Sequence, residues 1–193
     1  DMVTVPSAMA LGALDAADIR QMARVTAREL REVGINTNYA PTVDVNINPH
    51  NPVIRTRSFG ESPDVVARAG VASVEGHIDE LVIPTLKHFP GHGDTNVDSH
   101  HGLPVIDQPL ERLHAVELAP FRAGIAAGVP SIMTAHIVFP ALDEHPATLS
   151  KRILTGLLRE EMGFAGLVVT DSMSMDAIAE RYGLADAAIR AKA

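Results

Sequence analysis

The chain has 193 residues, of which 46% are hydrophobic, so it is long enough to bury one sizeable core. Its formal net charge of −8 argues against a nucleic-acid partner, and no apolar run reaches the roughly 18 residues of a membrane-spanning helix. The absence of Cys excludes disulfides, thiolate nucleophiles and Cys-ligated zinc.

The first part of the chain predicts two helices separated by a strand and an irregular stretch. Asp15 suits the N-cap of a first helix, because apolar residues recur at helical spacing after it until Gly34. A strand is expected over residues 35–45, followed by a polar, irregular stretch over 48–61. The Ser62-Pro63 pair is typical of a helix start and predicts a second helix to about Glu80.

The second part continues the alternation of strands and helices. The predicted elements are a strand over 81–86, a helix over 108–127 with a new segment at Pro120, a strand over 131–136, an amphipathic helix capped by Ser150 and ended by Gly163, a strand over 166–170 and a helix from about Met175. Short apolar strands alternating with helices indicate an α/β fold with a parallel sheet. A complete (β/α)8 barrel needs about 250 residues, so about four βα units make part of one.

Polar residues follow the C-terminal end of each predicted strand. They are Asp44 with Asn46, Lys87 with His88, His136, and Asp171. That edge of a parallel sheet carries the chemistry in open α/β sheets and in barrels. His136 and Asp44 are expected to support the site from behind the reacting groups.

The polar stretch over residues 87–103 contains four His, two Asp and one Lys. Within it, Asp98 could hold one ring nitrogen of His100 and leave the other nitrogen free to give and take a proton. Asp171 could serve as a nucleophile, a base or a metal ligand, or only as a helix N-cap. Arg57 could anchor a substrate hydroxyl or carboxylate, or form a surface ion pair.

A metal site is the competing interpretation of this stretch. Six possible ligands fall within fourteen residues: His88, His92, Asp94, Asp98, His100 and His101. They form neither a His-x-x-x-His helix motif nor an EF-hand loop, and the intervening glycines oppose a helix. We therefore expect neither a metal nor a cofactor.

The run over residues 87–100, Lys-His-Phe-Pro-Gly-His-Gly-Asp-Thr-Asn-Val-Asp-Ser-His, resembles the signature of glycoside hydrolase family 3 in its β-N-acetylglucosaminidase branch. Further similarities follow in the family's order, in residues 40–44 with 57–60, 133–140 and 169–175. The resemblance implies that Asp171 is the nucleophile and that His100, paired with Asp98, is the general acid/base. It also implies that Lys87, His88 and Arg57 hold the sugar hydroxyls.

The implied activity is that of a retaining exo-β-N-acetylglucosaminidase acting on peptidoglycan-derived or related glycans. A phosphorylase of the same family, a metal-dependent barrel hydrolase and an inactive relic remain open as alternatives. The resemblance places residues 1–193 in one catalytic domain, incomplete at both ends, with barrel strands four to seven. Unpaired strand edges would then leave the chain alone poorly stable and inactive. The full-length protein is expected to be a bacterial monomer, either cytoplasmic or exported to the cell envelope.

Overall fold

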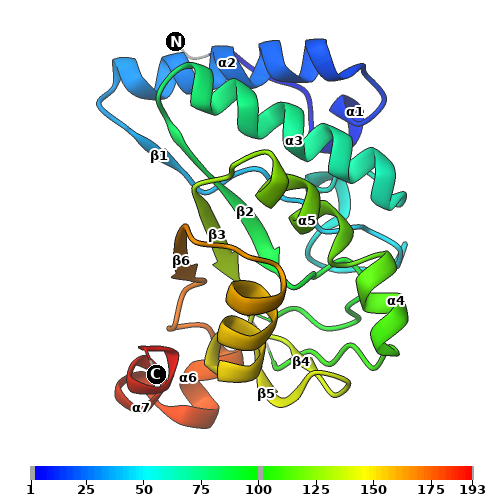
Figure 1. The fold of residues 1–193 in the computed structure, drawn as a ribbon, viewed down its shortest axis with the longest axis vertical. Helices are drawn as coiled ribbons and strands as arrows, with labels where there is room; N and C mark the ends of the chain where they lie inside the picture. Colours follow the sequence, from blue (N-terminus) through cyan, green and yellow to red (C-terminus); the bar gives the residue numbers. More distant parts are fainter. Residues whose placement is uncertain (1–2, 100–101, 193) are drawn as a thin grey trace.

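The computed structural model describes residues 3–99 and 102–192, and its centre is a parallel sheet. The strands lie in the order β1 (Thr37–Asn38), β2 (Ile83–Phe89), β3 (Ser131–Thr134) and β6 (Leu167–Thr170). All three pairings are parallel, and β3 and β6 pair without a register shift. Figure 1 shows these strands running in one direction, so their C-terminal ends meet at one edge. The predicted α/β class with a parallel sheet is confirmed.

Helices cover one side of the sheet. The long helices α2 (Ala16–Glu32) and α3 (Pro63–Asp79) lie side by side at one end of the molecule, and α5 (Ala119–Ala126) lies along β2 (Figure 1). The predicted cap of the first helix is confirmed, since the Asp15 carboxylate accepts a hydrogen bond from the Asp18 N–H at 2.9 Å. Phe89 of β2 and Phe121 of α5 pack edge to face, with ring centroids 5.2 Å apart.

Smaller elements complete the chain. They are α1 (Ala8–Leu11), η1 (Arg55–Arg57), α4 (Leu110–Ala115), the antiparallel hairpin of β4 (Val138–Phe139) and β5 (Asp143–Pro146), η2 (Ala147–Leu149), the π-helix η3 (Arg152–Glu161), α6 (Asp176–Tyr182) and α7 (Leu184–Lys192). The hairpin was not predicted. The predicted cap of the η3 segment is confirmed, because Ser150 Oγ accepts from the Ile153 N–H at 3.0 Å.

Two strand predictions are corrected. The expected strand over residues 35–45 is regular only over β1, because Pro41 has no N–H to donate to a ladder. The backbone still follows β2: the N–H of Val43 donates to the carbonyl of Lys87 at 2.8 Å. The strand expected over 81–86 begins at Ile83 and continues to Phe89, so Lys87 and His88 lie in the strand itself and not on the loop after it.

Within the described part of the chain, no helix is both long and apolar enough to cross a membrane.

Candidate active site

A cavity of about 200 Å³ opens at the C-terminal edge of the sheet. Its polar lining includes Tyr39, Arg57, Lys87, His88, His92, Ser99 and Asp171. These residues come from the segment after β1, from η1, from β2, from the stretch after β2 and from the end of β6. Strand ends from distant parts of the sequence therefore bring cations, imidazoles and a carboxylate to one place.

The buried carboxylate of Asp44 holds the end of β2. Its side chain is fully buried, and its Oδ1 accepts the backbone N–H of His88 at 3.1 Å and of His92 at 2.7 Å. Its Oδ2 lies 2.8 Å from His88 Nδ1. Burial alone would raise the pKa of Asp44, but the attraction of His88 and these hydrogen bonds hold that pKa below its usual value. Asp44 is thus an anion that orients two histidines.

His88 connects this carboxylate with a second one. An ionised carboxylate only accepts hydrogen bonds, so Nδ1 of His88 carries a hydrogen directed at Asp44. The opposite nitrogen, Nε2, lies 3.9 Å from Oδ2 of Asp171. The ring is therefore fixed with Nε2 directed toward Asp171 and the cavity.

Asp171 stands at the point where β6 ends. Its side chain is 27% exposed, and its Oδ1 accepts the backbone N–H of Ser172 at 2.7 Å. Its own backbone N–H donates to the carbonyl of Thr134 at 3.3 Å, which ties it to β3. One oxygen is thus held by the backbone, while the other faces His88.

His136 braces the turn that follows Asp171. It is 1% exposed, and its Nε2 lies 2.9 Å from the carbonyl oxygen of Ser172. A carbonyl only accepts, so Nε2 carries the hydrogen, and Nδ1 faces the Thr148 hydroxyl at 2.8 Å. Burial lowers the pKa of His136 and so favours the neutral ring. His136 is not among the residues that line the cavity, and its supporting role in the site stays a prediction.

Lys87 and Arg57 supply positive charge next to Asp171. Burial and the neighbouring Arg57 lower the pKa of Lys87, whereas Asp171 and Asp44 act in the opposite direction. Arg57 is exposed, and its side chain reaches the cavity from η1. Ammonium and guanidinium groups donate hydrogen bonds only, which suits hydroxyl and carboxylate oxygens.

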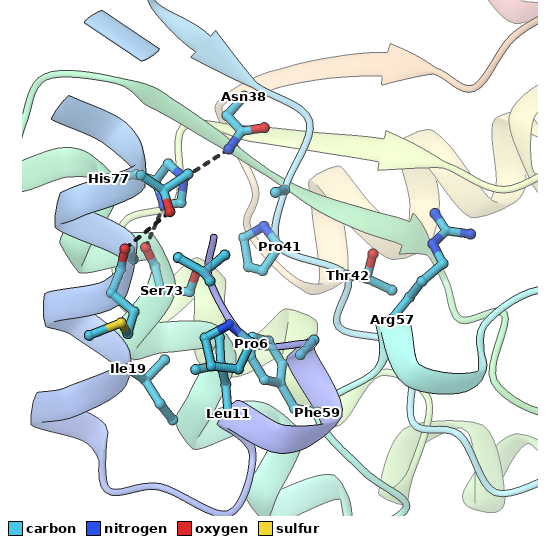
Figure 2. A pocket seen from close by; sticks show the side chains of 16 residues that line it. Pro6, Leu11, Ile19, Asn38, Pro41, Thr42, Arg57, Phe59, Ser73 and His77 are labelled. Carbon is cyan, nitrogen blue, oxygen red and sulfur yellow. Dashed lines mark hydrogen bonds between the residues drawn. The ribbon is translucent and has the colours of Figure 1, made fainter. Parts of the chain in front are cut away.

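A second cavity, of about 230 Å³, lies between α2, α3 and the segment over residues 38–42 (Figure 2). Its walls are mainly apolar, with Leu11, Ile19 and Phe59 among them. Its polar contacts include those that join His77 Nε2 to Asn38 Nδ2 at 2.9 Å and His77 Nδ1 to the carbonyl oxygen of Ser73 at 2.8 Å. None of the described residues that line this cavity is an Asp or a Glu, so it lacks a carboxylate comparable to that of Asp171 in the cavity at the strand ends.

Comparison with known proteins places this chain in a family. The family model described as the glycosyl hydrolase family 3 N terminal domain matches residues 1–192. The chain belongs to glycosyl hydrolase family 3. The four parallel strands are therefore an arc of the (β/α)8-type barrel of that domain, as predicted.

Relatives of known structure and curated relatives agree with this family 3 membership. The solved β-N-acetylglucosaminidase of family 3 from Paenibacillus sp. str. FPU-7 is 51% identical with a TM-score of 0.97, and the match covers 99% of this chain and 37% of that one. Beta-hexosaminidase A of Pseudoalteromonas piscicida is 47% identical over 182 residues, which are 88% of this chain and 30% of the relative. Beta-hexosaminidase of Stenotrophomonas maltophilia (strain K279a) is 38% identical over 180 residues, or 90% of this chain and 53% of the relative. This chain thus spans between about a third and about half of the curated relatives it matches.

In this family 3 chain, the structure gathers most of the residues selected from the sequence. Arg57, Lys87, His88 and Asp171 line one cavity, Asp44 contacts His88, and His136 contacts the carbonyl of Ser172. Asp98 is partly buried on the stretch after β2. His100 lies outside the described residues, so its pairing with Asp98 stays a prediction.

Sequence reasoning considered His92 only as a possible metal ligand and did not select Ser99. In the structure both line the cavity, and the His92 ring hydrogen-bonds to Thr95 and Ser99. Among the residues that the structure describes, no three His, Asp or Glu side chains are grouped as metal ligands would be. The sequence does contain a local signal for His92 and Ser99, because polar residues are closely spaced within and after the run Gly91-His92-Gly93.

Proposed function

We propose that the protein carrying this chain is a retaining exo-β-N-acetylglucosaminidase that removes terminal N-acetylglucosamine from peptidoglycan-derived or related glycans. The observation that carries the proposal is the partly exposed carboxylate of Asp171, which accepts the backbone N–H of Ser172 at a strand end and is flanked by Lys87, Arg57 and His88. The names of the similar proteins, β-N-acetylglucosaminidase and β-hexosaminidase, support the same class of reaction.

In the first step, Asp171 Oδ2 attacks the anomeric carbon and the glycosidic bond breaks. The imidazolium of His100 gives its proton to the departing oxygen, and the products are an alcohol and a glycosyl ester of Asp171. The carboxylate of Asp98 would stabilise that imidazolium and hold its tautomer.

In the second step, neutral His100 takes a proton from water as the water oxygen attacks the anomeric carbon. The ester bond breaks, Asp171 is restored as a carboxylate, and two inversions give net retention. A histidine in this place departs from the usual pair of carboxylates, and the anionic Asp98 would raise its affinity for the proton that it gives to the departing oxygen.

The sugar would be held by the groups around Asp171. The ammonium of Lys87 and the guanidinium of Arg57 can donate to ring hydroxyls, and His88 Nε2 faces the same space. Because Asp44 fixes the His88 ring and accepts from two backbone N–H groups, this part of the site is organised before the sugar binds.

The positive charges near Asp171 make a phosphorylase a second candidate, because they would attract a phosphate ion. Lys87 and Arg57 are cations beside the cavity, and a neutral histidine base does not repel an anionic acceptor. Phosphate in place of water would attack the glycosyl ester and release N-acetylglucosamine 1-phosphate.

The test is hydrolysis of an aryl N-acetyl-β-glucosaminide by the full-length protein, followed by proton NMR of the first-formed sugar. The expected first product is the β anomer, and the α anomer would refute a retaining mechanism. The same reaction in phosphate buffer separates hydrolase from phosphorylase by the release of the sugar phosphate. Activity lost to a chelator and restored by a metal ion would instead support the metal-dependent alternative.

A further inference from the structure

A chain of hydrogen bonds runs from Thr95, on the stretch after β2, through the ring of His92 to Ser99. His92 is 3% exposed, and its Nδ1 lies 2.8 Å from the hydroxyl of Thr95. Its Nε2 lies 3.3 Å from the hydroxyl of Ser99, which is also 3% exposed. One buried ring thus contacts two side chains that are four residues apart.

The hydrogen positions in this chain follow from counting donors. The hydroxyl of Thr95 has one hydrogen and donates it to the carbonyl of His92 at 3.1 Å. Thr95 must then accept from Nδ1 of His92, so Nδ1 carries the ring hydrogen. Burial lowers the pKa of His92, which keeps the ring neutral and leaves a lone pair on Nε2. Nε2 therefore accepts a hydrogen bond from the Ser99 hydroxyl.

Several further hydrogen bonds fix His92 and Thr95, where this chain of hydrogen bonds begins. The backbone N–H of His92 donates to Asp44, the carboxylate that also orients His88. Asn51 is fully buried, and its amide donates to the carbonyl of His92 at 2.8 Å and to the Thr95 hydroxyl at 3.3 Å. His92 is accordingly held by the same anion as the sugar-facing end of β2.

At its other end, this chain of hydrogen bonds reaches α6, the helix that follows Asp171 in the sequence. The carbonyl of Ser99 accepts the N–H of Ala177 at 3.4 Å, and Ala177 lies in the first turn of α6. Ser99 and His92 line the same cavity as Asp171. Ser99 is thus attached on one side to β2 through His92 and on the other to the helix after β6.

We propose that His92 is a positioning residue, which accepts the Ser99 hydroxyl and thereby holds Ser99, the residue between Asp98 and His100 in the sequence, at the cavity that contains Asp171. This inference rests on the proposed function, because it assigns His92 an effect on the acid/base step. Ser99 is bonded covalently to both members of that pair, so a shift of Ser99 moves the pair directly.

Two substitutions of His92 separate its two hydrogen bonds. In His92→Gln the amide lies near the former Nε2 and can still accept from Ser99. In His92→Asn the amide lies near the former Nδ1 and can still donate to Thr95, but it leaves Ser99 without a partner. If His92 only stabilised the fold, both variants would lose activity in proportion to their loss of stability.

The measurement is kcat and KM for a glycoside with a poor leaving group and for an activated dinitrophenyl glycoside, in the full-length protein. We expect His92→Asn and Ser99→Ala to lower kcat for the poor leaving group by about tenfold, with little change in KM, because one buried hydrogen bond is lost. For the activated glycoside, which needs little acid assistance, the loss should stay within about twofold. His92→Gln should keep most of the activity on both substrates.

Ser131→Ala is the matched control. Ser131 is fully buried in β3, and among the described residues its hydroxyl has no hydrogen-bond partner. This variant should retain parental kcat on both glycosides. Equal losses for the two substrates in Ser99→Ala, or equal activities of the Asn and Gln variants, would overturn the positioning role of His92. Absence of hydrolysis by the parent protein would refute the proposed function itself, and nitrogen NMR of the His92 ring would still report whether Nδ1 carries the hydrogen.

Discussion

Nε2 of His88 lies 3.9 Å from Oδ2 of Asp171, although 83 positions of sequence separate the two residues. The relationship depends on a third group, because the buried Asp44 holds the opposite ring nitrogen at 2.8 Å. Asp44 comes from the segment beside β2, His88 from β2 and Asp171 from β6. The ends of β2 and β6 and the segment beside β2 thus align two carboxylates on either side of one imidazole.

Replacing Asp171 by Asn should lower kcat by about 10⁴-fold or more, because the amide cannot form the glycosyl ester. A mechanism-based fluoro sugar should label Asp171, as shown by mass spectrometry of a proteolytic digest. Asp186→Asn is the matched control, since Asp186 is exposed on α7 and pairs with Arg190 there. Labelling at Asp98 or Asp176 would contradict the assignment of the nucleophile.

Replacing His100 by Ala should reduce turnover of poor leaving groups by about 10²- to 10⁴-fold, the usual contribution of a general acid. Activated aryl glycosides should lose much less in the first step, because their leaving oxygens need no proton. The comparison of kcat/KM across a series of leaving groups measures this. A loss independent of the leaving group would remove His100 from the role of acid.

Stability should fall on mild acidification because burial lowers the pKa of His77, His92 and His136. Below about pH 6.5, the unfolded chain binds more protons at these sites than the folded chain does. The free energy of unfolding should therefore decrease from about pH 7 toward pH 5, by up to about 1.4 kcal/mol per pH unit for each histidine.

Denaturant unfolding at several pH values checks this dependence. His77→Gln offers a test outside the cavity at the strand ends, because His77 lies on α3 and contacts Ser73 and Asn38. The variant should show a shallower loss of stability with acidification, whatever its stability at neutral pH. A slope equal to that of the parent would show that His77 does not contribute.

Gly93→Ala should damage both stability and activity. A Cβ at this position would collide with the carbonyl of Val45, which is backbone and cannot rotate away. The stretch after β2 would have to leave the strand end, at an expected cost of about 1–3 kcal/mol, typical of overpacking. Gly156→Ala is the control, since a Cβ there meets no atom within 4 Å. Thermal unfolding and kcat of both variants give the comparison, and equal effects would contradict this account of Gly93.

The sequence alone determined the class of the fold and the edge of the sheet at which the polar candidate site residues gather. Helical spacing between Asp15 and Gly34, and the Ser62-Pro63 start, predicted α2 and α3 to within about two residues. Continuous apolar runs followed by polar residues identified β2, β3 and β6, because a strand buried on both faces must be apolar along its length. These signals depend only on residues that are close in the sequence, so they can be recognised without the tertiary structure.

Only the tertiary structure decided which polar residues meet. Asp44 binds His88 and His92 across 44 and 48 positions of sequence, and no periodicity predicts such a bond. The structure also showed that His88 stands within β2 and that the hairpin of β4 and β5 follows β3. A buried carboxylate must find donors wherever the fold provides them, since its desolvation would otherwise be too costly. The donors that a buried carboxylate needs can come from residues far away in the sequence. The arrangement around Asp171 therefore follows only from the assembled strand ends.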